Sequence, residues 1–275
     1  MFLYNMSDPE YIIFTDMDGT LIDHNTYSYR DALPALRLIS KKNIPLIFCT
    51  SKTKAELEVY CDELNIHHPL IPENGGAIFI PEDYFNFPYK YDKKIDNYHV
   101  IELGERYEIL RSILKEISTK IDCKVIGFGD MDIDQVSLEC SLDRQSAALA
   151  KKRDYDEAFI ILSPPEKAIQ LEQEILNKGY NYTKGGRFHH IMGSNDKGRS
   201  VSILSDLYRQ KWSNIKTIGL GDSLNDLPML KAVDIGILVQ KPGRIYDPAV
   251  IDPSIKKGNG IGPAGWSKEL INILK

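Results

Sequence analysis

Short apolar runs alternate along this chain with segments in which apolar residues recur every three to four positions. The first stretch of this alternation predicts, in chain order, a strand at 11–14, a helix over 31–42, a strand at 45–49, a helix over 53–65, and strands at 70–71 and 77–80. Because these strands are apolar almost throughout, we expect a parallel sheet covered by helices on both faces. The predicted class is α/β, with a Rossmann-like three-layer core.

The character of the sequence changes after Pro81. Residues 82–97 are rich in Tyr, Phe, Pro and Lys and show no clean periodicity. Beyond them, helical stretches separate predicted strands at 98–101, 125–128, 158–162 and 188–192. This pattern is typical of a smaller α+β module.

The α/β pattern then returns, with a predicted helix over 196–209, a strand at 215–220, a helix over 225–233 and a strand at 235–239. The smaller module is therefore inserted into the first one. We predict a core built from residues 1–83 and 193–275, and an α+β cap domain spanning residues 84–192.

Composition narrows the class of ligand. The chain has 275 residues and a formal net charge of -5, so it offers no broad basic surface for nucleic acid. It has no apolar run near the roughly 18 to 20 residues of a membrane span, no C-x-x-C pair and no signal-like N-terminus. We expect a cytoplasmic monomer or homodimer that acts on a small molecule and binds neither nucleic acid nor membrane.

Two acidic motifs follow predicted strands. One is Asp16-Met17-Asp18-Gly19-Thr20, and the other is Gly221-Asp222-Ser223-Leu224-Asn225-Asp226. Taken alone, the first contains a common turn dipeptide and the second a common helix cap. Both occur at the carboxyl ends of strands, where open α/β sheets bind ligands. Together they indicate a site, and clustered carboxylates without other ligand types favour a hard cation such as Mg²⁺.

Positive groups for an anionic substrate come from two further places. Thr50 and Ser51 end the strand at 45–49 and lead into a helix, which supplies a hydroxyl and free backbone amides. Lys197 opens the helix over 196–209, from which an ammonium group can reach the same pocket. The plain alternatives are a helix cap at Thr50 and a solvated lysine at 197.

These residues, in this order, resemble the motifs of the haloacid dehalogenase superfamily of phosphotransferases. The resemblance implies that Asp16 is the nucleophile that forms an aspartyl-phosphate, and that Asp18 acts first as general acid and then as general base. It also implies that Thr50 and Lys197 hold the phosphoryl oxygens.

The same resemblance implies a metal site and a cap. The Asp222 carboxylate, the Asp16 carboxylate and the Asp18 backbone carbonyl would bind Mg²⁺, with Asp226 supporting them. The insertion between the threonine and lysine motifs matches the superfamily's type 2 (C2B) cap, which closes over the active site.

Four further motifs are similar to those of the mannosyl-3-phosphoglycerate phosphatase family. They are Thr50-Ser51-Lys52-Thr53, the run 72–81 beginning Pro72-Glu73-Asn74-Gly75-Gly76, Gly185-Gly186-Arg187-Phe188, and Gly262-Pro263-Ala264-Gly265-Trp266. Other type 2 cap sugar phosphatases generally have Thr-Gly-Arg in place of the first. The similarity implies a phosphoric monoester hydrolase that converts mannosyl-3-phosphoglycerate to the compatible solute mannosylglycerate. One departure is Glu139-Cys140-Ser141-Leu142, where the family's cap often has a Thr-Gly-Leu-like element.

Substrate contacts are expected, besides Thr50 and Lys197, at Ser51, Lys52, Asn74, Gly75, Gly76, Arg153, Arg187, His190 and Asn225. Arg187 is our candidate for the glycerate carboxylate, because a guanidinium offers two parallel donors. His189 and His190 should point to opposite faces of their strand, so they cannot chelate one ion.

Three alternatives remain open from the sequence. The core also suits another sugar-phosphate phosphatase or mutase, including one specific for glucosyl-3-phosphoglycerate, and a catalytically silent binding module. The segment 193–200 is a near miss for a Walker nucleotide-binding loop, with Arg199 where that motif has lysine.

Overall fold

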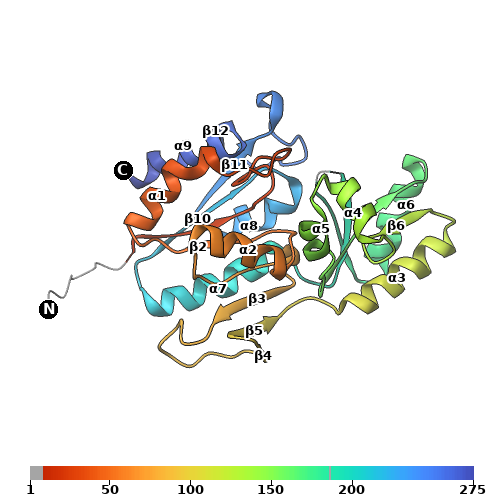
Figure 1. The fold of residues 1–275 in the computed structure, drawn as a ribbon, viewed down its shortest axis with the longest axis horizontal. Coiled ribbons are helices and arrows are strands. Elements are labelled where there is room, and N and C mark those ends of the chain that lie inside the picture. The colour runs from red at the N-terminus through yellow and green to blue at the C-terminus, as the bar shows by residue number, and fades with distance from the viewer. Residues whose placement is uncertain (1–8, 186) are drawn as a thin grey trace, which may run out of the picture.

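A five-stranded parallel sheet forms the centre of the molecule (Figure 1). The computed structural model describes residues 9–185 and 187–275. The strands lie in the spatial order β12 (Lys256–Ile261), β11 (Ile235–Gln240), β10 (Lys216–Gly221), β1 (Tyr11–Thr15) and β2 (Leu46–Phe48). Because every neighbouring pair is parallel, the carboxyl ends of all five strands meet at one edge of the sheet.

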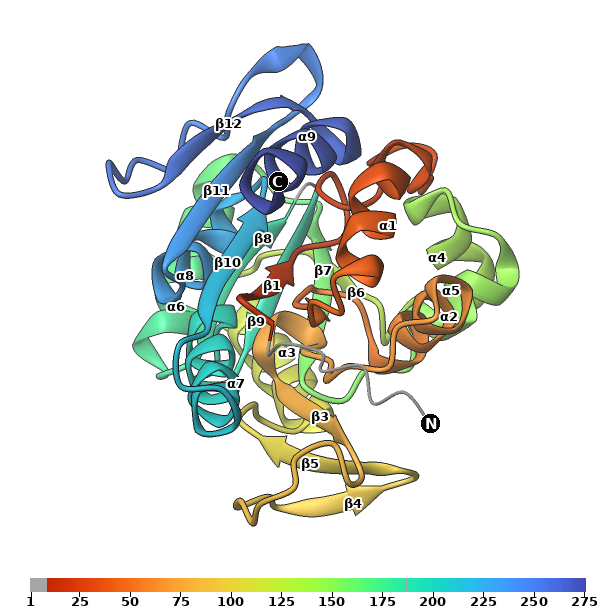
Figure 2. The same ribbon diagram turned by 90° about the vertical axis from the view of Figure 1, so that its left-hand side faces the viewer.

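Helices cover both faces of this sheet (Figure 2). Successive residues of β1 alternate between the faces, with Ile13 on one side and Ile12 and Phe14 on the other. The first face packs against α1 (Leu33–Lys41), α2 (Lys54–Leu64) and α9 (Gly262–Leu274), and the second against α7 (Lys197–Lys211) and α8 (Leu227–Ala232). The predicted three-layer α/β core is confirmed.

A small antiparallel sheet lies beside the core. Its strands are β3 (Ala77–Pro81), β5 (Tyr98–Glu102) and β4 (Lys93–Ile95), in that spatial order. The expected domain boundary at residue 84 falls between β3 and the other two strands of its sheet. The backbone N–H groups of Leu103 and Gly104 also both donate to the carbonyl of Gly76. We therefore propose that the inserted domain starts near residue 105.

The inserted domain is built on a four-stranded antiparallel sheet, seen at the right of Figure 1. Its spatial order is β6 (Val125–Gly127), β7 (Asp156–Ile161), β9 (Phe188–Met192) and β8 (Asn181–Gly185). One face packs against α3 (Tyr107–Lys120) and α6 (Pro165–Asn177), and the other against α4 (Ile133–Cys140) and α5 (Arg144–Ala150). The predicted α+β character of this module is confirmed.

Some predicted elements differ in detail. The helix predicted over 31–42 begins as a 3₁₀ turn, η1 (Arg30–Ala32), and the one over 225–233 as η3 (Leu224–Asp226). The predicted strand at 70–71 forms only isolated bridges. Two further 3₁₀ turns are η2 (Glu73–Gly75) and η4 (Pro242–Arg244). No helix within residues 9–185 and 187–275 has the length and apolar character needed to cross a membrane.

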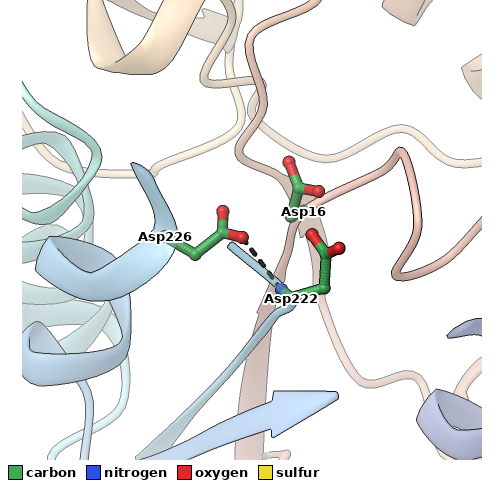
Figure 3. A group of neighbouring side chains, drawn as sticks. All are labelled: Asp16, Asp222 and Asp226. Atoms are coloured by element: carbon green, nitrogen blue, oxygen red, sulfur yellow. Dashed lines mark hydrogen bonds between the residues drawn. The ribbon is translucent and has the colours of Figure 1, made fainter. Parts of the chain in front are cut away.

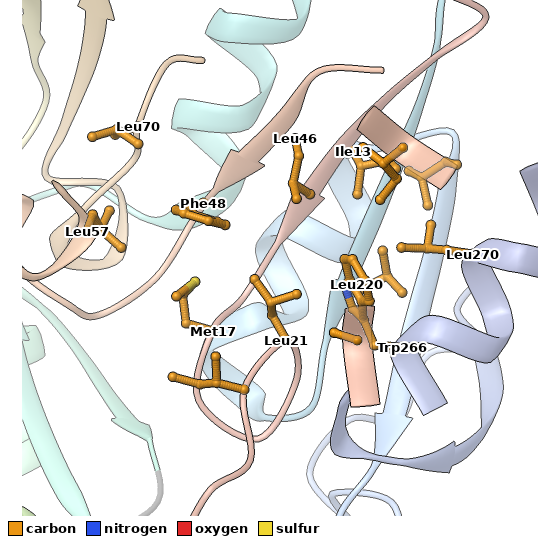
Figure 4. Close-up of a cluster of buried hydrophobic side chains, with 14 of the residues drawn as sticks. Ile13, Met17, Leu21, Leu46, Phe48, Leu57, Leu70, Leu220, Trp266 and Leu270 are labelled. Atoms are coloured by element: carbon orange, nitrogen blue, oxygen red, sulfur yellow. The ribbon is translucent and has the colours of Figure 1, made fainter. Parts of the chain in front are cut away.

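Trp266 of α9 lies in the buried cluster on one face of the central sheet (Figure 4) and contacts the end of β1. It is fully buried, and its indole Nε1–H donates to Thr15 Oγ1 at 2.9 Å. Thr15 Oγ1 in turn donates to the carbonyl of Asp16 at 2.7 Å. Packing of α9 therefore fixes the backbone at the end of β1.

We predict that Trp266→Ala lowers the free energy of unfolding by about 3 to 5 kcal/mol, because it leaves a cavity and removes the partner of Thr15. Urea unfolding followed by circular dichroism measures this change. Lys268→Ala, on the exposed side of the same helix, serves as control and should change the value by less than about 0.5 kcal/mol. Equal losses in both variants would contradict this role of Trp266.

Candidate active site

Three buried carboxylates converge at the carboxyl edge of the central sheet (Figure 3). Asp16 directly follows β1, Asp222 directly follows β10, and Asp226 ends η3. Strands β1 and β10 are hydrogen-bonded neighbours, which brings their two aspartates together. One carboxylate oxygen from each residue lies within 4.8 Å of the others. The convergence expected from the two acidic motifs is therefore present.

Lys197 lies between two of these carboxylates. Its Nζ is 2.7 Å from Asp16 Oδ1 and 2.6 Å from Asp226 Oδ1, and all three side chains are buried. Burial alone would lower the pKa of Lys197, but the neighbouring carboxylates raise it, so the group stays charged. Lys197 is consequently neither a solvated lysine nor free to act in a Walker loop.

One lysine does not balance the three acids. Burial, followed by the charge of Asp226, raises the pKa of Asp16 well above its usual value despite Lys197. The same two causes, in the same order, raise the pKa of Asp222 to about 7. The site therefore has unbalanced negative charge and carboxylate oxygens as its donors, which fits a hard divalent cation.

Asp226 shapes the loop that carries Asp222. Its Oδ2 accepts hydrogen bonds from the backbone N–H groups of Asp222 at 2.9 Å and Ser223 at 3.0 Å, while its Oδ1 accepts from Lys197. A Cβ on Gly221 would lie 2.4 Å from the Asp226 side chain, so only glycine fits there. Asp16 and Asp222 retain oxygens that point into the shared space.

A second lysine reaches the site from the loop after β2. Lys52 Nζ lies 3.1 Å from Asp18 Oδ2 and 3.4 Å from Glu56 Oε1. Asp18 Oδ1 is buried and has no hydrogen-bond partner among the described residues. Thr50 is fully buried at the base of this loop, and its Oγ1 accepts from the Lys52 backbone N–H at 3.4 Å.

A pocket of about 570 Å³ opens above these residues, between the core and the inserted domain. From the core it is lined by Asp16, Asp18, Ser51, Lys52, Asp222 and Asn225, among others. From the inserted domain it is lined by residues that include Phe128, Arg153, Arg187, Phe188 and His190. The two parts of the chain thus share one cavity, as a cap over an active site requires.

Several predicted contact residues pack against protein and do not line this pocket. A Cβ on Gly75, where φ is +83°, would lie 2.3 Å from the Asp196 carbonyl oxygen, and one on Gly76 would lie 2.3 Å from Tyr155 Cβ. Asn74 donates to a carboxylate of the inserted domain. Gly76 and Asn74 thus join the core to the inserted domain, whereas Gly75 packs within the core.

The structure places Arg187 at the rim of the pocket. Its side chain is 54% exposed and its guanidinium pairs with Glu139 of α4 and lies over the Phe188 ring. The preceding Gly186, part of the motif used above, lies outside the described residues. Arg187 therefore has an anionic partner within the protein.

Arg153 is buried, and its guanidinium forms hydrogen bonds with other residues of the protein. Its guanidinium donates to the Asp156 carboxylate at 3.0 Å, to the Asp156 carbonyl at 2.6 Å and to the Ser51 carbonyl at 2.9 Å. The last contact bridges the two parts of the chain. The sequence reasoning did not select Asp156, although an acidic residue opening an apolar strand was a usable signal.

Comparison with known protein families identifies the family of this chain. A family model described as haloacid dehalogenase-like hydrolase matches residues 13–242. The chain belongs to this family. The resemblance noted in the sequence is thereby confirmed.

Two relatives are similar over most of their length. A protein of Methanococcoides burtonii named glucosyl-3-phosphoglycerate/mannosyl-3-phosphoglycerate phosphatase is 56% identical over 96% of this chain and 97% of its own. A mannosyl-3-phosphoglycerate phosphatase of Pyrococcus furiosus is 34% identical over 83% of this chain and 90% of its own.

Solved structures share the fold. A Thermoplasma acidophilum protein has a TM-score of 0.67 with 17% identity, covering 98% of this chain and all (100%) of its own. A sugar phosphatase described as haloacid dehalogenase subclass IIB has a TM-score of 0.56 with 17% identity, covering 83% of this chain and 87% of its own.

The carboxylate cluster predicts how stability depends on pH in the absence of metal. Asp16 and Asp222 have raised pKa values in the folded state, so their protonation favours folding. That stabilisation is complete below their unfolded pKa of about 4 and is lost as pH rises through about 7.

Chelator-treated protein should therefore melt about 5 °C lower at pH 8 than at pH 5.5. Adding millimolar MgCl₂ should raise the melting temperature more at pH 8, where both carboxylates are ionised. Differential scanning fluorimetry measures both effects. An equal MgCl₂ effect at the two pH values would show that these aspartates do not bind the ion.

Proposed function

We propose that this protein is a Mg²⁺-dependent phosphatase that hydrolyses mannosyl-3-phosphoglycerate to mannosylglycerate and phosphate. The chemical part of the proposal rests on the buried arrangement of Asp16, Asp222 and Asp226 around the Lys197 ammonium. The substrate is inferred from the M. burtonii relative, whose name covers the glucosyl as well as the mannosyl compound. We therefore extend the proposal to glucosyl-3-phosphoglycerate.

The carboxylates of Asp16 and Asp222, with the Asp18 backbone carbonyl, would hold the Mg²⁺. When bound, the ion offsets negative charge on the phosphoryl oxygens that approach a carboxylate nucleophile. The residues fit this group because they provide oxygen donors and excess negative charge. Asp226 and Lys197 would keep these donors in place.

Asp16 is the proposed nucleophile. Lys197 holds one of its oxygens, Oδ1, which leaves Oδ2 to attack the phosphorus. The new bond joins Asp16 to phosphorus while the bond between phosphorus and the glycerate oxygen breaks. Lys197, together with the Thr50 hydroxyl and nearby backbone amides, would offset the charge on the remaining phosphoryl oxygens.

Asp18 is the proposed proton donor and acceptor. Lys52 holds its Oδ2 at 3.1 Å, and its Oδ1 has no partner among the residues described. Oδ1 would give its proton to the departing glycerate oxygen. The resulting carboxylate would then take a proton from the water that attacks the aspartyl-phosphate, which releases phosphate and restores Asp16.

The inserted domain would exclude bulk water during these steps. Tyr27, in the loop after the Asp18 motif, donates its hydroxyl to the Cys140 carbonyl of α4 at 2.7 Å. Strand β8 of the inserted domain also lies against η3 of the core. These contacts support a closed arrangement over the phosphoryl site.

Substitution of the two N-terminal aspartates tests these roles. Asp16→Asn should abolish phosphate release from both glycosyl-3-phosphoglycerates, because an amide is a poor nucleophile. Asp18→Asn should lower kcat by roughly 10²- to 10⁴-fold, since it removes the transferable proton. Phosphate release and MgCl₂-dependent melting are measured in parallel.

Asp18→Asn should keep the MgCl₂ effect on melting, because its proposed metal contact is the backbone carbonyl. Asp16→Asn should weaken that effect. Wild-type protein that releases no phosphate from either glycosyl compound would refute the proposed substrate. Full activity of Asp16→Asn would refute the proposed nucleophile.

A further inference from the structure

Buried polar contacts run from the Asp222 loop into the inserted domain. Asn225 Nδ2 donates to Asn74 Oδ1 at 3.2 Å, and Asn74 Nδ2 donates to Asp156 Oδ2 at 2.7 Å. His190 Nδ1 lies 2.8 Å from Asp156 Oδ1. Because an ionised carboxylate only accepts hydrogen bonds, Nδ1 must carry a proton. This series of contacts ends at His190, and it does not involve the other ring nitrogen, Nε2.

We propose that His190 binds the glycerate carboxylate of the substrate through Nε2–H, and that Asp156 and Asn74 are positioning residues that fix its ring. This inference rests on the function proposed above. It concerns the part of the substrate that the phosphoryl site does not contact.

The ring of His190 is oriented toward the pocket. The residue is only 4% exposed, yet it lines the cavity. A Cβ built on Gly185 would lie 3.9 Å from Nε2 and 3.6 Å from Asn225 Nδ2, which places Nε2 on the side of the pocket nearest η3. No hydrogen bond to Nε2 is formed within residues 9–185 and 187–275. Nε2 is therefore free to meet a ligand, and it donates when both ring nitrogens carry a proton.

Asp156 is suited to hold His190 in this state. It is fully buried and also accepts from Arg153 Nη2 at 3.0 Å. Burial raises its pKa, but the charges of His190 and Arg153 and the hydrogen bond from Asn74 outweigh burial and keep the pKa below its usual value. A carboxylate at Nε2 would give each ring nitrogen an anionic acceptor, so both nitrogens donate in the bound state.

The lysine and arginine side chains that line the pocket already have anionic partners. Lys52 contacts Asp18 and Glu56, Lys241 contacts Asp247 at 2.8 Å, and Arg187 contacts Glu139. Arg153 is shared between Asp156 and the Ser51 carbonyl. Use of Arg187 for the substrate, as the sequence suggested, would require it to leave Glu139. His190 needs no such exchange.

The position also suits the substrate's chemistry. In a 3-phosphoglycerate the carboxylate is two carbons from the carbon that bears the phosphate ester. The side chain that binds the carboxylate must therefore lie close to the residues that hold the phosphoryl group. His190 meets this condition because its Nε2 and Asn225 Nδ2 both lie within 4 Å of a Cβ built on Gly185, and Asn225 is three positions after the proposed metal ligand Asp222.

The test compares two substrates and four variants, which are His190→Asn, His190→Gln, His189→Gln and Arg187→Ala. The substrates are mannosyl-3-phosphoglycerate and an analogue with a hydroxymethyl group in place of the carboxylate. In His190→Asn the side-chain amide can still donate to Asp156 but cannot reach the Nε2 position, whereas His190→Gln can place an amide N–H near Nε2. His189→Gln is the matched control, because His189 faces the opposite side of β9 and packs on Phe159.

We expect His190→Asn to lower kcat/KM for mannosyl-3-phosphoglycerate by about 30- to 1,000-fold, mainly through KM. The analogue should change by less than about threefold. His190→Gln should recover part of the loss, and His189→Gln should leave both substrates within about threefold of wild type. Melting temperatures of the variants establish that they are folded.

Each other result overturns the inference. Equal losses on both substrates would mean that His190 serves only folding or cap closure. A carboxylate-dependent loss in Arg187→Ala, with none in His190→Asn, would assign the carboxylate to Arg187. Absence of wild-type turnover on the glycosyl substrates would instead refute the proposed function, so the two failures are distinguishable.

Discussion

Unbalanced negative charge at the carboxyl edge of the central sheet is the constraint on which the rest of this structure depends. Two neighbouring parallel strands end in Asp16 and Asp222, and Asp226 adds a third buried carboxylate. Lys197 supplies the closest positive charge, at 2.7 Å from Asp16 and 2.6 Å from Asp226, while Lys241 lies 4.0 Å from Asp222. Because Lys197 begins α7, the chain must return to the core at this residue after the inserted domain.

That return requires the inserted domain to be held close to the core. Glu73 and Asn74 have positive φ values of 49° and 53°, a backbone state that is uncommon without glycine. The state directs the Glu73 carboxylate to the backbone N–H groups of Asp154 and Tyr155, at distances of 2.8 to 3.0 Å. Burial raises the pKa of Glu73 to about 8, so this contact is retained at a cost in desolvation. The local strain and the desolvation are offset by docking of the two parts.

The sequence predicts the core and the phosphoryl site because both depend on local patterns. Buried parallel strands are continuous apolar runs, and their acidic motifs directly follow them. The apolar pattern does not predict strand β12. Its segment Lys256–Ile261 contains two lysines, two glycines and an asparagine, which an edge strand tolerates. The sequence groups strands β4 and β5 with the inserted domain, because no local pattern shows that Ile101 pairs with Ile78, on the other side of the change in sequence character at Pro81.

Recognition of the rest of the substrate depends on strand register, which explains why it is harder to predict. Strands β7 and β9 are antiparallel, with Asp156 opposite Met192 and Ala158 opposite His190. Asp156 and His190 are therefore diagonal neighbours on one face, within side-chain reach. A shift of one residue would turn His190 to the opposite face and bring His189 toward the pocket. Phe159, Ile191 and their packing partners in the buried cluster fix this register, so the apolar core of the inserted domain determines which histidine faces the ligand.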